Sequence, residues 1–211
     1  MQSTKPQGES FTYIDIDAVN NNKNIIDKPK KILCTQAPSR ATRKVEEDNI
    51  LFSMVRPYLK NIALVSQEHK EAIASTGFYV IRPFSVLFSK YIFRLLLSPY
   101  VVDGLNQYMK GDNSPSINNE HIESYLYPIP PINEQYRIVA QIQEILPLVE
   151  RYNSSQAIQD KLNSEIKDKL RKSILQEAIQ GRLVPQIESE GTAAELLEQI
   201  KVEKQKLVKE G

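Results

Sequence analysis

The feature that most limits the fold of this chain is a long helical seam in its second half. Apolar residues recur there at spacings of three and four, which predicts a helix that pairs with another helix. A later part of the seam keeps a uniform spacing of four, so its stripe drifts around the helix. We expect helix over residues 133–180, ~70 Å long at about 1.5 Å per residue. The seam residues are Ile138, Ile142, Ile145, Val149, Tyr152, Ile158, Leu162, Ile166, Leu170 and Ile174.

Two positions argue against one unbroken helix. Pro147 lies inside the pattern, and an interior proline usually kinks or breaks a helix. Residues 153–155, Asn-Ser-Ser, are a second weak point. One bent helix and two shorter collinear helices both fit. In either case the seam cannot be buried by a domain that ends before the helix begins, so we expect a partner for it.

Stop and start signals follow this helix. Gly181 is suited to a helix end, and Pro185 cannot continue one. Thr192 and Glu195 have the spacing of a capping box, which predicts a last helix over residues 193–209.

The first 131 residues are expected to form short elements instead. Period-two alternation and short apolar runs predict strands, and a stripe of three-to-four spacing predicts helix. Ser98 before Pro99 is typical of a helix N-terminus, and Gly111 fits a stop. Strands are expected at residues 11–18, 50–55, 59–66 and 78–81, and helix within residues 85–109. The expected fold class is α+β: a mixed α/β domain over residues 1–131, a long coiled-coil-forming helix within residues 132–183, and a tail over residues 184–211 that carries a short helix.

Charge is distributed unevenly along the chain although the formal net charge is only +1. Residues 28–44 hold six basic side chains and no acidic one. Such a window can contact several phosphates of a nucleic acid. The alternative is a solvated loop, because Glu46, Glu47 and Asp48 follow directly.

Nothing in the sequence predicts an enzyme. The seven glycines form no phosphate-binding pattern, and His69, His121 and Cys34 show no metal-ligand spacing. Both histidines are expected at the surface. Asp160, Glu165 and Lys167 have the residue types of a nuclease site, but they occur in a helix rich in Glu and Lys, where coincidence explains them. No catalytic residue, metal or cofactor is predicted.

The cysteine content and the hydropathy of the sequence indicate in which cellular compartment the protein is expected. A single cysteine excludes an internal disulfide framework. The start of the chain has no apolar signal-peptide core, and no apolar run approaches the roughly 18 to 20 residues that cross a bilayer. We expect a cytoplasmic protein without a membrane partner.

Several stretches resemble the specificity subunits of Type I restriction-modification systems. Residues 127–139, Tyr-Pro-Ile-Pro-Pro-Ile-Asn-Glu-Gln-Tyr-Arg-Ile-Val, resemble the junction between recognition domain and conserved helix in that family. Residues 172–186, Lys-Ser-Ile-Leu-Gln-Glu-Ala-Ile-Gln-Gly-Arg-Leu-Val-Pro-Gln, resemble the end of that helix. Further matches lie at residues 37–43, 51–58, 74–78 and 111–117, so the resemblance runs from about Phe11 to Leu207.

The resemblance implies a target-recognition domain followed by a helical spacer. In the family, a full-length subunit carries two such units in tandem, and the two spacers pack as an antiparallel coiled coil that separates the domains on a bipartite site. The subunit has no catalytic role and bridges two modification (methyltransferase) subunits, which restriction subunits can join. The partners it implies are double-stranded DNA, the modification subunit and the restriction subunit.

Each signature occurs once, so the chain resembles half of such a subunit. A half subunit is expected to form a homodimer through its spacer and to read inverted half-sites. One departure is the missing opening segment with its tryptophan, which predicts a lost first strand or two and an open sheet edge or a hole in the domain. The chain could therefore be a truncated product or a silent specificity cassette. A dimeric coiled-coil adaptor that binds protein is the alternative from another class.

Candidate DNA-binding residues follow from the chemistry of base edges and phosphates, which favours Arg, Lys, Asn and Ser on loops. For several of them a purely structural role is an alternative, since Arg56 before Pro57 could simply brace the fold. Contacts to the modification subunit are expected along the spacer and at residues 128–135. The candidates for DNA contact are Lys30, Lys31, Arg40, Arg43, Arg56, Lys60, Lys110, Asn113, Ser114 and Ser116, and those for dimerisation are the ten seam residues named above.

Overall fold

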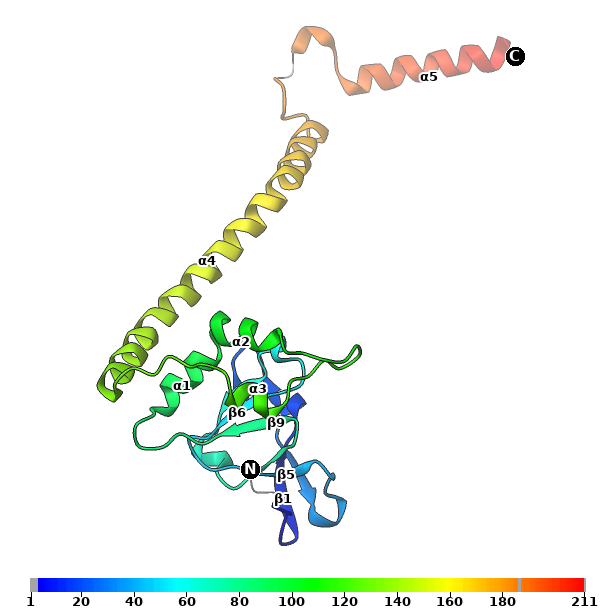
Figure 1. Cartoon of the computed structure of the whole chain (residues 1–211). Coiled ribbons are helices and arrows are strands. Elements are labelled where there is room, and N and C mark those ends of the chain that lie inside the picture. The colour runs from blue at the N-terminus through cyan, green and yellow to red at the C-terminus, as the bar shows by residue number, and fades with distance from the viewer. Residues whose placement is uncertain (1–3, 186, 211) are drawn as a thin grey trace. The chain divides into compact units, whose positions relative to one another are not determined.

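The computed structural model describes residues 4–185 and 187–210. The chain forms two compact units that divide between Leu146 and Pro147. The first unit holds the strands, three short helices and the start of a long helix, and Figure 1 shows these elements in chain order. The α-helices are α1 (Ser89–Leu96), α2 (Pro99–Asn106), α3 (Asn119–Glu123), α4 (Ile132–Ile179) and α5 (Ala193–Glu210).

The strands of the first unit form two sheets and a small ribbon. A 4-stranded sheet has the order β4-β1-β8-β5, and a 3-stranded sheet has the order β7-β6-β9. Strands β2 (Val19–Asn20) and β3 (Ile25–Ile26) pair as an antiparallel hairpin. The other bounds are β1 (Ser10–Ile14), β4 (Lys30–Leu33), β5 (Ala41–Lys44), β6 (Ile50–Ser53), β7 (Ile62–Leu64), β8 (Ile73–Ser75) and β9 (Phe78–Ile81). Short 3-10 turns are η1 (Ile16–Ala18), η2 (Cys34–Gln36), η3 (Pro57–Leu59), η4 (Gln67–His69) and η5 (Glu188–Glu190).

Strand β6 is the centre of the packing because it is buried on both faces. Ile50 and Phe52 belong to a core cluster that also contains residues of α1, α2 and α3. Leu51 points the other way, into a second cluster that contains residues of β1 and β8. The expected strand at residues 50–55 is thus confirmed over Ile50–Ser53. Figure 1 shows the resulting layers, with α1 to α3 on the side of β6 and β9 away from β1 and β5.

The expected strand at residues 11–18 is wrong beyond Ile14. The side chain of Asp15 accepts a hydrogen bond from the Ile16 N–H group at 2.9 Å, which caps η1 and ends the strand. Strand β1 pairs antiparallel with β4 and parallel with β8, so it lies inside its sheet. The edges of this sheet are β4 and β5.

The expected helical region at residues 85–109 forms two helices, in agreement with the helix N-terminus predicted at Ser98. Ser98 separates them: its hydroxyl oxygen accepts from the Val101 N–H group at 3.4 Å, as its predicted capping role requires. Helix α2 ends at Asn106, and Gly111 follows in a loop with φ 103°.

Helix α4 continues through Pro147, which decides between the two alternatives for this region. Pro147 and Gln143, whose carbonyl group loses its helical partner, are both exposed, so water can satisfy that carbonyl. The predicted stop at Gly181 is confirmed: with φ 69° at Gly181, the N–H group of Arg182 donates to Glu177 O at 2.9 Å.

The predicted capping box of the last helix is also confirmed. The N–H group of Thr192 donates to Glu195 Oε2 at 3.0 Å, and the N–H group of Glu195 donates to Thr192 Oγ1 at 3.3 Å. In the described residues, no helix combines the length and hydropathy that crossing a membrane requires.

The first turn of α4 is held on the first unit by Gln135, whose side chain is completely buried. Its Oε1 accepts from the Phe88 N–H group at 2.8 Å. Its Nε2 donates to Pro130 O at 2.8 Å and to Val86 O at 3.1 Å. One amide thus joins the proline-rich junction, the loop before α1 and the start of the helix.

We predict that Gln135→Leu lowers the free energy of unfolding of the first unit by about 2 to 4 kcal/mol. The change leaves buried N–H and C=O groups without partners, and each such group costs about 1 to 3 kcal/mol. Urea denaturation followed by circular dichroism measures the loss. Gln143→Leu, on an exposed face of the same helix, is the matched control. Equal stability of the two variants would contradict the prediction.

Candidate nucleic-acid interface

The turn η3 places two candidate cations, Arg56 and Lys60, at its two ends. Both have left-handed backbones, with φ 49° and 54°. A non-glycine residue in this region costs on the order of 1 to 3 kcal/mol and persists only where its surroundings hold it. The surroundings of η3 therefore explain why the two residues stay in place.

The loop at residues 110–116 holds one side of this turn. The N–H group of Arg56 donates to Pro115 O at 2.8 Å, and its Nη2 donates to Asn113 O at 2.7 Å. The N–H groups of Lys110 and Ser116 each donate to the other residue's carbonyl group at 3.0 Å, which closes the loop. The candidates Lys110, Asn113, Ser114 and Ser116 consequently lie beside Arg56.

The hairpin between β2 and β3 makes hydrogen bonds to the other side of the η3 turn. Asn21 Nδ2 donates to Leu59 O at 3.0 Å, and Asn24 Nδ2 donates to Lys60 O at 2.8 Å. Three segments far apart in sequence thus meet at η3. We call residues 20–24, 56–60 and 110–116 the three-loop cluster.

The three-loop cluster has an excess of positive charge. Its cations are Lys23, Arg56, Lys60 and Lys110, and its one carboxylate is Asp112. Lys23, Arg56 and Lys110 are exposed and Lys60 is half-buried. A cluster of fixed cations with little compensation can contact phosphates at the cost of few broken ion pairs.

The other four candidate cations lie on or beside the 4-stranded sheet, and two of them, Lys30 and Arg40, are paired with carboxylates. Lys30 Nζ pairs with Asp17 at 2.6 Å, and this hydrogen bond raises the pKa of Lys30. Arg40 Nη2 lies 3.4 Å from Asp15 Oδ2. The same two carboxylates and Arg40 line an open hollow of about 390 Å³. Negative charge in this hollow opposes a phosphate there.

Lys31 and Arg43 differ from each other in exposure. Lys31 is exposed on the edge strand β4. Arg43 is half-buried on β5, and its Nε is buried without a hydrogen-bond partner among the described residues. The structure therefore divides the ten DNA candidates into the six of the three-loop cluster and these four of the sheet.

Two further features of the three-loop cluster were not predicted. Tyr58, 45% exposed, lies on η3 between Arg56 and Lys60. The position of this aromatic residue between two cations in the sequence could have identified it as a candidate. The hairpin loop carries the run Asn20–Asn24, in which four of five residues are asparagine, and this composition was a signal as well.

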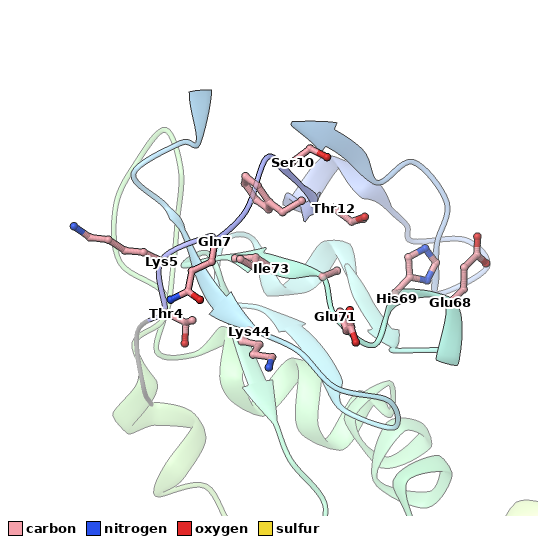
Figure 2. Close-up of a pocket in the computed structure, with 12 residues that line it drawn as sticks. Thr4, Lys5, Gln7, Ser10, Thr12, Lys44, Glu68, His69, Glu71 and Ile73 are labelled. Carbon is pink, nitrogen blue, oxygen red and sulfur yellow. The ribbon is translucent and has the colours of Figure 1, made fainter. Parts of the chain in front are cut away.

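A separate hollow of about 510 Å³ lies along β1, β5 and β8, and Figure 2 shows residues that line it. It has balanced charge, with Lys5 and Lys44 against Glu68 and Glu71, and it contains none of the ten DNA candidates. His69 also lines it and is buried, with Nδ1 3.0 Å from Ser66 Oγ, so the expectation that this histidine is a surface residue is wrong. The residues that the structure describes contain no His, Cys, Asp and Glu group able to hold a metal.

The predicted seam of α4 divides between the two units. Ile138 packs against the core of the first unit, and Ile142 is half-buried. The remaining seam residues leave large apolar surfaces exposed: Ile145, Val149, Tyr152, Ile158, Leu162, Ile166, Leu170 and Ile174.

Comparison with known proteins places this fold among solved specificity subunits. The structure matches the HsdS subunit from Thermoanaerobacter tengcongensis with a TM-score of 0.68 and 30% identity, covering 83% of this chain and 45% of that one. It also matches a chain from a structure of complex assembly and conformational transition of the type I R-M system, with a TM-score of 0.66 and 30% identity over 87% of this chain and 46% of that one.

Sequence comparison agrees with this result. The Type I restriction enzyme EcoDI specificity subunit of Escherichia coli is 27% identical over 165 residues, which cover 74% of this chain and 35% of that protein. The chain thus spans between a third and a half of the length of these relatives. The sequence model of the Type I restriction modification DNA specificity domain matches residues 2–168. With most of its length matched, the chain belongs to the family of Type I restriction modification DNA specificity domains.

Proposed function

We propose that this chain recognises a DNA sequence for a Type I restriction-modification complex and contacts the duplex through the three-loop cluster. The observation that carries the proposal is the weakly compensated positive charge on loops that hydrogen bonds hold rigidly. Rigid loops retain the geometry that base readout needs, and fixed cations position the duplex through its phosphates. The chain itself carries no chemistry in this role.

The second part of the proposal concerns the spacer. Residues 1–131 act as the recognition domain, residues 132–183 as the spacer and residues 184–211 as a tail. The exposed seam of α4 pairs with a second copy of the chain, which removes its apolar side chains from water. A two-fold dimer would present two recognition domains to inverted half-sites of one bipartite site.

The remaining partners follow from the family. A modification subunit would bind along the spacer and at residues 128–135, where Ile129 and the neighbouring Tyr136 are exposed. Methylation, with its methyl donor, belongs to that subunit, and a restriction subunit joins the same complex. A DNA-modifying complex of this kind works in the cytoplasm, where the free Cys34 stays reduced.

We predict that the double variant Lys60→Gln/Lys110→Gln binds duplex DNA more weakly and with a shallower dependence on salt. Each lost phosphate contact makes the negative slope of log K against log salt shallower by about one, so the magnitude of the slope should decrease by about two. Fluorescence anisotropy measures it, with a labelled duplex and the full chain purified with the modification subunit of its own organism.

The matched control is Lys169→Gln/Lys172→Gln on α4, which removes the same charge away from the three-loop cluster. Its slope should equal that of the unchanged chain. Equal slopes for the two double variants would place the phosphate contacts elsewhere. A chain that binds no duplex at low salt would support the protein-binding adaptor instead.

We also predict that Leu162→Asp/Ile166→Asp converts the dimer into a monomer. Carboxylates in an apolar helix seam lose hydration without gaining partners. Sedimentation velocity measures the mass, and circular dichroism reports whether the first unit stays folded.

Asn163→Asp tests the effect of charge alone, because Asn163 lies between the two seam positions on another face of the helix. This control should remain a dimer. An unchanged chain that sediments as a monomer at micromolar concentration would overturn the dimer proposal.

A further inference from the structure

The tip of the β2–β3 hairpin presents two side chains that the fold itself does not use. Asn22 and Lys23 are exposed. Within the described part of the chain, neither side chain makes a hydrogen bond or an ion pair. The other three asparagines of the same run all make side-chain hydrogen bonds, which sets Asn22 apart.

Asn20 fixes the conformation of the tip. Its Oδ1 accepts from the N–H groups of Asn22 at 3.1 Å and Lys23 at 3.2 Å. Its carbonyl group accepts from the Asn24 N–H group at 2.7 Å, and Asn24 takes a left-handed backbone with φ 54°. Asparagine tolerates this conformation better than most residues, so the loop has one defined shape.

Asn21 and Asn24 then fix the tip in space. Their amide groups donate to Leu59 O and Lys60 O, as described above, and so join the hairpin to η3. The tip and the cations of η3 consequently form one rigid surface. Three asparagines thus serve to hold the fourth in place.

We infer that Asn22 reads an A·T base pair and that Lys23 contacts a phosphate beside it. This inference rests on the proposed function of the chain. A two-stranded β-ribbon fits the major groove, and an asparagine amide can accept from N6 of adenine while it donates to N7. The ammonium group of Lys23 adds attraction to the backbone that is independent of sequence.

The neighbouring charges favour the same arrangement. Arg56 and Lys60 on η3 are cationic, and the hairpin loop at residues 20–24 carries no carboxylate. The nearest acid bonded to the run is Asp27, which lies 3.4 Å from Asn20 Nδ2 at the base of the hairpin. The tip itself therefore brings no carboxylate toward a polyanion, whereas Asp15 and Asp17 lie in the hollow that Asn21 also lines.

The test uses the full chain purified with the modification subunit of its own organism and a pool of short duplexes with a randomised centre. Bound duplexes are recovered and sequenced. The unchanged chain should enrich a motif that contains an A·T pair. Asn22→Ala should lose about tenfold or more of the preference at one base pair and keep the rest of the motif. Lys23→Ala should keep the whole motif and lower the salt slope of binding by about one.

Asn163→Ala on α4 is the matched control and should behave as the unchanged chain. Thermal melting checks that Asn22→Ala is folded, as expected for an exposed turn residue. A motif that Asn22→Ala leaves unchanged would overturn the inference while the proposed function stands. Duplex binding without any enriched sequence would overturn both the inference and the proposed recognition of a DNA sequence. If the unchanged chain binds no duplex, the proposed function fails first.

Discussion

The double-sided burial of β6 is the constraint on which the rest of the first unit depends. Ile50 and Phe52 hold the helical layer, and Leu51 holds the 4-stranded sheet. The chain continues from this strand through Met54, whose carbonyl group accepts from the Ile117 N–H group at 2.9 Å, into the turn at Arg56. The turn at residues 56–60 therefore follows directly on the most deeply buried strand, which explains how a left-handed, cation-bearing turn is held in place.

A second constraint acts where the spacer begins. The Gln135 side chain forms hydrogen bonds with three backbone groups, the Phe88 N–H group and the carbonyl groups of Val86 and Pro130. It can do so only because the junction, the loop before α1 and the first turn of α4 meet at one point. The apolar side of α4 serves two purposes in succession. Ile138 contributes to the core of the domain, and the seam residues from Ile145 to Ile174 are exposed.

Local signals predicted best what depends on local physics. The cap at Ser98, the stop at Gly181 and the capping box at Thr192 each involve residues within five positions of one another, and all three are confirmed. The strand at residues 11–18 was predicted too long, because Asp15 bonds the next N–H group and competes with the strand. The burial of His69 on η4 was not predicted either, although its hydrogen-bond partner Ser66 is only three positions away in sequence.

The sequence by itself indicated the family, the order of an α+β domain and a long helix, the ends of the last two helices and a set of candidate DNA-binding residues. The tertiary structure alone decided how those residues are grouped. Lys30 pairs with Asp17, whereas Arg56 donates to Asn113 O and Asn21 donates to Leu59 O. These partners lie 13 to 57 positions apart in sequence. Such pairings arise from the packing of whole sheets, so no local spacing in the sequence reveals which cation is paired with a carboxylate and which is not.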